Sequence, residues 1–176
     1  HRLFVRSGMI KKLAPGIYSY GLLLLRSLEK MTTIIKEELG QEGAFPILMP
    51  MVQPAALWKK SGRWPQMGEL LKFKNKNNHD FCLGATHEEV IVDFMSNLIQ
   101  SYRDLPSIPY QIQTKYRDEI RPRFGLMRGR EFIMKDAYSF DLNKDEALRS
   151  YEKMKEAYHR IFKRLGVEFM VVKADS

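Results

Sequence analysis

The sequence predicts an α+β fold in which an antiparallel sheet is flanked by helices. Residues 22–39 and 144–165 each carry apolar side chains at three- and four-residue steps, as amphipathic helices do. Short strand-like runs lie between them and are joined by turns instead of regular βαβ units, which favours antiparallel pairing. The 176 residues contain no internal repeat or low-complexity tract, so we expect one compact unit.

The first long helix is predicted to end at Gly40 and Gly43, because glycine commonly stops a helix. Its apolar stripe consists of Leu22, Leu25, Leu28, Met31, Ile35 and Leu39. A strand is expected next, over Phe45–Met49, and Pro50 would end it.

A β-hairpin and a second helix follow. Leu70–Phe73 and Asp80–Leu83 flank the polar turn Asn75–Asn78, the usual pattern of a hairpin. The second helix is expected to begin at Thr86, whose hydroxyl would cap it with Glu89 three positions on. Its apolar stripe consists of Ile91, Phe94, Met95 and Leu98.

Two further strands and a last helix complete the prediction. Gln111–Tyr116 alternates with period two, and Glu131–Lys135 follows an arginine-rich connection, so the two should pair as antiparallel strands. The last helix is capped by Asn143 and stopped by Gly166, and Val167–Val172 would form a final strand. The side chains expected to face inward from this helix are Leu148, Tyr151, Met154, Tyr158, Phe162 and Leu165.

Composition narrows the function classes. There are 29 Lys and Arg against 21 Asp and Glu, a formal charge of +8, which favours anionic partners. The single cysteine, Cys82, excludes an internal disulfide and an all-cysteine zinc site and favours a reducing, cytoplasmic setting, where a buried structural thiol is expected. The longest apolar run, Leu22–Leu25, falls far short of the ~20 residues of a membrane span. The chain starts at His1 without a recognisable leader, so a segment of a longer protein is expected.

The densest group of functional side chains surrounds the predicted strand pair. Arg117 and Glu119 are two apart and would share a strand face, while Arg128, Phe132 and Asp136 recur at steps of four. Guanidinium groups bind phosphate, a carboxylate accepts from an exocyclic amine, and an aromatic ring stacks on a purine. The group therefore fits a nucleoside triphosphate. A surface hairpin with cross-strand ion pairs explains the same spacing equally well.

Two metal hypotheses fail on spacing. Thr86-His87-Glu88-Glu89 would need a second histidine where Ile91 stands to bind zinc, and the capping box leaves His87 and Glu88 unexplained. The Asp141–Asp145 run resembles a calcium loop. Its sixth position, however, is Glu146 instead of glycine, so helix capping is favoured. A glycine-rich phosphate loop is also absent from the sequence, so side chains on a sheet would have to bind the nucleotide.

These residues resemble a known family. Arg117, Glu119, Arg128, Phe132 and Asp136 match the second signature motif of class II aminoacyl-tRNA synthetases, and the helix leading through Gly43 to Pro50 resembles the first. Longer strings are similar to bacterial-type prolyl-tRNA synthetases over essentially the whole chain. They are Ile47–Pro54, Leu57-Trp58, Ser61–Trp64, Thr86–Val90 and Tyr110–Phe140.

The resemblance implies a role for each site residue in ATP-dependent activation of L-proline and its transfer to tRNA(Pro). Arg117 would be the catalytic residue, binding the α-phosphate of ATP. Glu119 would contact the adenine amine, Phe132 would stack on the ring and Arg128 would contact the outer phosphates. Thr86 and Glu88 would bind proline, Glu88 receiving the charged imino nitrogen. Mg²⁺ would bridge the phosphates of ATP, with no protein metal site.

The resemblance also implies an incomplete class II sheet. Residues 1–176 would form the N-terminal portion of a single catalytic domain, carrying motifs 1 and 2. Motif 3, an editing insertion and an anticodon-binding domain would lie outside it. The motif 1 region would form a homodimer. This chain departs from the family pattern at Ala85, where proline is usual, and at Leu22–Leu24. A synthetase-like RNA-binding module without catalysis, using the positive charge, is the alternative, and a purely structural role ranks last.

Overall fold

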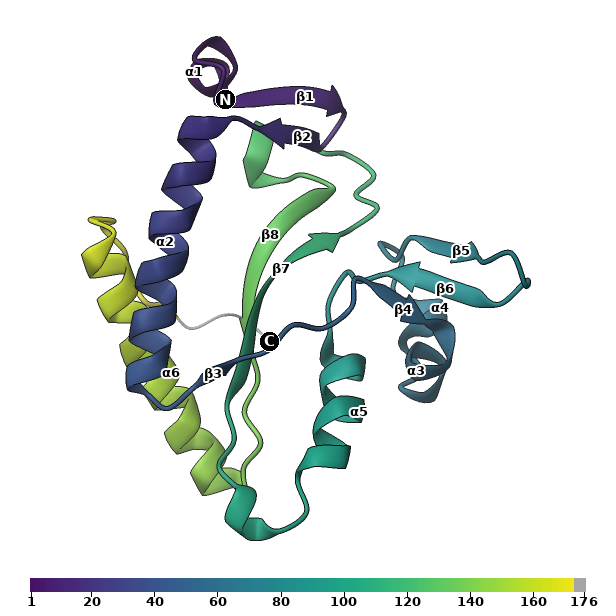
Figure 1. The fold of residues 1–176 in the computed structure, drawn as a ribbon, viewed down its shortest axis with the longest axis vertical. Coiled ribbons are helices and arrows are strands. Elements are labelled where there is room, and N and C mark those ends of the chain that lie inside the picture. Colours follow the sequence, from purple (N-terminus) through teal and green to yellow (C-terminus); the bar gives the residue numbers. More distant parts are fainter. Residues whose placement is uncertain (173–176) are drawn as a thin grey trace.

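The computed structural model describes residues 1–172 and confirms the predicted α+β class. The central sheet has the order β3-β7-β8, with bounds β3 (Phe45–Pro46), β7 (Pro109–Tyr116) and β8 (Glu131–Ala137). One face is covered by α2 (Leu22–Gln41) and α6 (Lys144–Arg164), and α5 (Glu88–Leu98) stands on the other side (Figure 1).

The strand pairs differ from the prediction in one respect. β7 and β8 are antiparallel as expected, from Tyr110 opposite Ala137 to Tyr116 opposite Glu131. β3, however, has only two residues and runs parallel to β7. The strand expected over Phe45–Met49 stops early because a side chain replaces the backbone as hydrogen-bond partner. The Met49 amide donates to Gln111 Oε1 at 3.2 Å.

A smaller antiparallel sheet lies beside the central one (Figure 1) and contains the predicted hairpin. Its order is β4-β6-β5, with bounds β4 (Val52–Pro54), β6 (Asp80–Leu83) and β5 (Lys72–Lys74). Two short helices pack nearby, α3 (Ala55–Lys60) and α4 (Arg63–Gln66). Single 3₁₀ turns are η1 (Tyr102–Asp104) and η2 (Gly125–Met127).

The N-terminal elements were not predicted. They are α1 (Arg2–Arg6) and an antiparallel hairpin of β1 (Ile10–Ala14) and β2 (Ile17–Tyr20). The turn of this hairpin touches the β7–β8 loop, because the Gly16 carbonyl accepts from the Arg130 amide at 2.7 Å. Gly16 has φ +77°, and a Cβ there would lie 2.8 Å from the Arg130 nitrogen, so this contact requires glycine.

Three apolar clusters fill the interior. The first lies between α2, α6 and the central sheet, around Leu39, Tyr110 and Ala157. The second joins the small sheet to α3 through Trp58 and Cys82. The third packs α5 against the opposite face of the central sheet through Ile91 and Met95. The sheet is therefore covered on both faces, and its β7–β8 loop end remains open for a site.

The last helix is capped as predicted, but it buries a different face. The Asn143 side chain accepts from the Glu146 amide at 3.0 Å. The buried residues of α6 are Ser150, Met154, Ala157 and Ile161. Leu148, Tyr151 and Phe162 are exposed. The predicted inward face was right at Met154 and at Tyr158, which packs half-buried against the first cluster. It was wrong at the three exposed side chains, because the small side chains of Ser150 and Ala157 are the ones that allow close packing.

Other boundaries also moved. α2 continues through Gly40 to Gln41. Of the two glycines predicted to end this helix, Gly43 has a positive φ and Gly40 does not. Residues 167–172 form no strand, since no described strand pairs with them. Within the described chain no helix is long and apolar enough to cross a membrane.

Candidate functional site

Four of the predicted site residues line one cleft. Arg117, Glu119, Arg128 and Phe132 surround a volume of about 430 Å³ at the open end of the β7–β8 pair. The antiparallel register brings them together, because the chain leaves β7 after Tyr116 and returns at Glu131 directly opposite. The sequence prediction that these four side chains meet is therefore confirmed.

The reason for their meeting was only partly foreseen. β7 ends at Tyr116, so Arg117 and Glu119 do not share a strand face as expected. Instead the backbone turns tightly, with the Glu119 amide donating to the Arg117 carbonyl at 2.7 Å. Arg128 also precedes its strand. A turn, and not strand periodicity, places these three groups in the cleft.

The cleft combines two carboxylates, Glu69 and Glu119, with two guanidinium groups and an aromatic ring. Glu119 accepts from the Arg121 amide at 3.0 Å and from Arg128 Nε at 2.8 Å, and these two bonds hold its pKa below the ordinary value. The Arg117 guanidinium lies 5.6 Å from the centre of the Phe132 ring. Such a surface can bind phosphate oxygens and the face of an aromatic base together.

Thr86 and Glu88 belong to a second part of the site, the turn formed by residues 84–88. The Thr86 hydroxyl donates to the Glu88 carboxylate, which also accepts from Arg63 Nη1 at 3.1 Å. Burial alone would raise the pKa of Glu88, but the bonds from Thr86 and Arg63 outweigh it and lower that pKa. Glu88 is thus an exposed carboxylate that stays ionised, suited to a cationic ligand.

The capping prediction at this turn was wrong. α5 begins at Glu88 with His87 as its N-cap residue, and no side chain caps it. Thr86 bonds to a side chain and not to a helix amide. The backbone of Thr86 is held by Gln53, because the Thr86 carbonyl accepts from Gln53 Nε2 at 3.0 Å.

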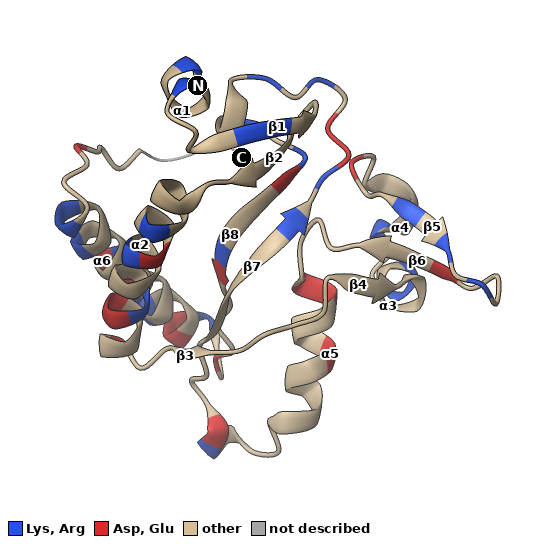
Figure 2. Ribbon diagram, turned by 45° about the horizontal axis from the view of Figure 1, so that its top comes forward, with Lys and Arg blue, Asp and Glu red and all other residues tan. Residues whose placement is uncertain are grey.

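The turn and the cleft adjoin each other. The Gly84 carbonyl accepts from the Tyr116 amide at 3.0 Å, and the Ala85 carbonyl accepts from Arg117 Nε at 3.3 Å. Figure 2 shows acidic residues at the start of α5, below basic residues at the end of β7 and on the loop that follows. An anion in the cleft and a cation at Glu88 could therefore belong to one pair of reacting molecules.

Sequence reasoning missed the residues that support the turn. Lys115, the partner of Phe132 across the strands, is fully buried with His87 and pairs with the partly buried Asp136. Asp136 does not line the cleft, although it belongs to the matched motif. A lysine inside a strand of alternating residues, on the same face as Arg117, was the available signal.

Within residues 1–172 no three His, Cys, Asp or Glu side chains cluster as a metal site. Asp141 accepts from the Ser150 hydroxyl at 2.6 Å, and the predicted capping of this segment is made by Asn143.

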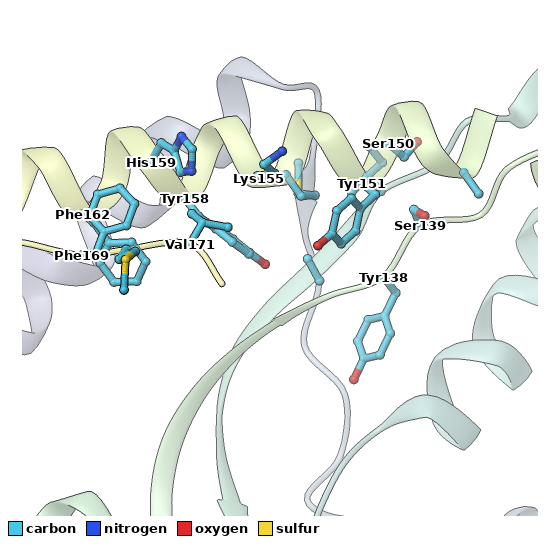
Figure 3. A pocket seen from close by; sticks show the side chains of 15 residues that line it. Tyr138, Ser139, Ser150, Tyr151, Lys155, Tyr158, His159, Phe162, Phe169 and Val171 are labelled. Atoms are coloured by element: carbon cyan, nitrogen blue, oxygen red, sulfur yellow. The ribbon is translucent and has the colours of Figure 1, made fainter. Parts of the chain in front are cut away.

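Another cavity, of about 620 Å³, lies between α6 and the segment after it (Figure 3). Tyr151, Tyr158, Phe162 and Phe169 line it, and none of the six predicted site residues does. Its lining is mostly apolar and aromatic, with Lys155 as its one lysine.

Comparisons with known proteins agree with this geometry. The sequence profile described as tRNA synthetase class II core domain (G, H, P, S and T) matches residues 71–176. The chain is 58% identical to a proline–tRNA ligase of Geobacter metallireducens and 59% identical to one of Burkholderia multivorans, each over 177 residues. Both alignments cover all of this chain and 31% of the relative, so the chain spans about a third of their length.

Solved structures show the same fold. A Giardia lamblia prolyl-tRNA synthetase in complex with prolyl-adenylate superimposes with a TM-score of 0.84 and 21% identity, over 92% of this chain and 34% of that one. A Cryptosporidium parvum prolyl-tRNA synthetase complexed with L-proline and AMP gives 0.82 and 19%, over 93% and 33%.

Proposed function

We propose, since this chain belongs to the class II tRNA synthetase core domain family, that its parent protein activates L-proline with ATP and transfers the prolyl group to tRNA(Pro). The observation that carries the proposal is the cleft of Arg117, Glu119, Arg128 and Phe132, which is joined to the turn that carries Glu88 by the bond from Arg117 Nε to the Ala85 carbonyl. The relatives named as proline–tRNA ligases support proline as the amino acid.

Each side chain has a task in the first step. Phe132 stacks on adenine, Glu119 accepts from the adenine amine, and Arg128 moves from Glu119 to the outer phosphates. Arg117 binds the α-phosphate and stabilises the negative charge that develops as a proline carboxylate oxygen attacks phosphorus and pyrophosphate leaves. This is positioning and electrostatic catalysis, so the cleft needs no general base.

Thr86 and Glu88 select the amino acid. The ionised Glu88 carboxylate receives the cationic imino nitrogen of proline, and the Thr86 hydroxyl holds that carboxylate in place. Glu88 would exchange its bond to Arg63 for the substrate, or share it.

Mg²⁺ would accompany ATP without a dedicated protein site. The residues of the cleft fit this arrangement, because its two carboxylates, Glu69 and Glu119, are too few to enclose a metal ion, while Arg117 and Arg128 can bind phosphate oxygens directly. Bound magnesium would neutralise charge on the phosphates.

The remaining proposals concern the parent protein. We place residues 1–176 in the N-terminal part of one catalytic domain, with motif 3, the editing insertion and the anticodon-binding domain elsewhere in the protein. The exposed leucines Leu22, Leu23 and Leu25 on α2 support a homodimer through the motif 1 region. A cytoplasmic setting fits tRNA charging and the free thiol of Cys82.

Calorimetry on the full-length parent protein tests the function. A non-hydrolysable prolyl-adenylate analogue should bind, and the alanyl and threonyl analogues should bind much more weakly. Equal binding of all three would contradict proline selection. No binding of any, together with salt-sensitive RNA binding, would support the RNA-binding alternative. That alternative is not favoured, because it leaves Glu88 and the cleft without a role.

A further inference from the structure

Lys115 is a fully buried cation beneath the candidate site. Its side chain has no exposed surface, its Nζ donates to His87 Nδ1 at 2.5 Å, and the Asp136 carboxylate lies 3.1 Å away. Asp136 is itself held by Gln111 Nε2, at 3.1 Å, and by the Tyr138 hydroxyl. A buried ion pair is poor evidence of stabilisation, since apolar residues of similar volume often serve as well. The network therefore calls for another explanation.

The hydrogen bonds fix the protonation state of His87. Its Nε2 lies 3.0 Å from the Pro50 carbonyl oxygen, which can only accept, so Nε2 carries the proton. Nδ1 must then accept from the Lys115 ammonium. Burial, and secondly the charge of Lys115, lower the pKa of His87, in agreement with a neutral ring. Both ring nitrogens of His87 are thus hydrogen-bonded, Nε2 to the Pro50 carbonyl and Nδ1 to Lys115.

His87 lies between the two residues proposed to bind proline. Its ring is fully buried, whereas Glu88 is exposed and Thr86 half-buried. Anchoring the ring inward directs both neighbouring side chains outward. Gly84 completes the anchor, because a Cβ there would lie 2.8 Å from His87 Cε1 and 2.6 Å from Gln53 Nε2.

We infer that Lys115 is a positioning residue for amino-acid recognition, which acts through His87 to fix the turn that presents Thr86 and Glu88. This inference rests on the proposed function. Lys115 itself has no path to substrate, because the turn covers it. Its effect should appear in the binding of proline and not in the binding of ATP, whose cleft is formed by the β7–β8 loop.

The test measures proline-dependent ATP–pyrophosphate exchange with the full-length parent protein. Lys115→Met and His87→Leu should each raise the KM for proline by about tenfold or more, while the KM for ATP stays within about twofold. The Lys115→Met/His87→Leu double variant should be no worse than either single variant, because both remove the same contact. Non-additivity of this kind separates positioning through His87 from a general loss of structure.

Lys135→Met is the matched control. Lys135 lies on the same strand as Asp136 but contacts Tyr158 of α6 on the other face of the sheet. Its removal should leave the KM for proline unchanged. If circular dichroism shows that Lys115→Met does not fold, Lys115→Met/Asp136→Asn replaces it, since this pair removes both buried charges.

The outcomes separate the two hypotheses. Wild-type protein without proline-dependent exchange would overturn the proposed function. If the wild-type protein is active, three results would overturn the positioning role of Lys115 alone. They are an unchanged KM for proline in Lys115→Met, an equal rise in the KM for proline and the KM for ATP, and additive effects of Lys115→Met and His87→Leu. Failure of Lys115→Met/Asp136→Asn to fold would also overturn it, in favour of a structural role.

Discussion

The two halves of the site are built in opposite ways. The turn at residues 84–88 is held from below by buried groups, with Ala85 and His87 fully inaccessible. The β7–β8 loop is open to solvent, and Ile120 and Met127 are 85% and 88% exposed. Its main ion pair, between Arg128 and Glu119, has a half-exposed cation.

This difference determines how each half can respond to a ligand. Hydrogen bonds in a buried network are strong and costly to break, whereas exposed ion pairs contribute little and exchange readily. The turn proposed to bind the amino acid is therefore preformed. The nucleotide half can rearrange, because Arg128 can leave Glu119 at little cost when phosphate arrives.

The largest effect is expected where both halves meet. Arg117→Ala in the full-length protein should lower kcat/KM for proline-dependent pyrophosphate exchange by about 100-fold or more, because the developing charge at phosphorus loses its donor. Arg103→Ala serves as the control, since that guanidinium lies over Tyr102 in η1. Normal exchange by the Arg117 variant would remove this residue from the mechanism.

A change confined to the preformed half should affect one substrate. Glu88→Gln is expected to raise the KM for proline by about tenfold or more, through loss of a charged hydrogen bond, with the KM for ATP unchanged. Glu152→Gln, whose carboxylate pairs with Lys155 on α6, gives the comparison. An equal rise in both KM values would contradict the division of the site into two halves.

A change in the β7–β8 loop should raise the KM for ATP and not the KM for proline, and the effect should be smaller. Arg128→Ala should raise the KM for ATP several-fold and leave the KM for proline and the thermal midpoint nearly unaltered, because the Arg128 cation is half-exposed and the buried Glu119 keeps its bond from the Arg121 amide. Arg121→Ala is the matched control, since it keeps the backbone amide that binds Glu119. A large drop in the thermal midpoint would show that the loop is not adaptable.

The smallest effect concerns Cys82, which packs with Ala85 beneath the turn. Burial, and secondly the charge of Glu89, raise the pKa of its thiol to about 11. At pH 8 only about one thiol in a thousand is ionised, so native protein should barely react with a thiol reagent. Urea-unfolded protein is the positive control, and rapid native reaction would mean that the support of the turn opens.

Local patterns predicted several elements well. The β7–β8 pair, the β5–β6 hairpin and the Asn143 cap all join segments that follow one another along the chain, and all were confirmed. Predictions that depended on packing against a distant part of the chain were less accurate. The strand at Phe45 became parallel, the inward face of α6 shifted, and Thr86 lost its capping role to a contact with Glu88.

The candidate site divides in the same manner. The sequence alone determined that the residue types of the cleft suit a nucleotide, because their chemistry is local, whereas the proposed roles of Thr86 and Glu88 in amino-acid binding rest on the family resemblance. Only the tertiary structure decided what lies beneath them: Lys115, His87 and Asp136 are 28 and 21 positions apart. No periodicity links such residues, since their meeting depends on sheet register and on the packing of α5 against the sheet. Burial then decides which charges must find partners.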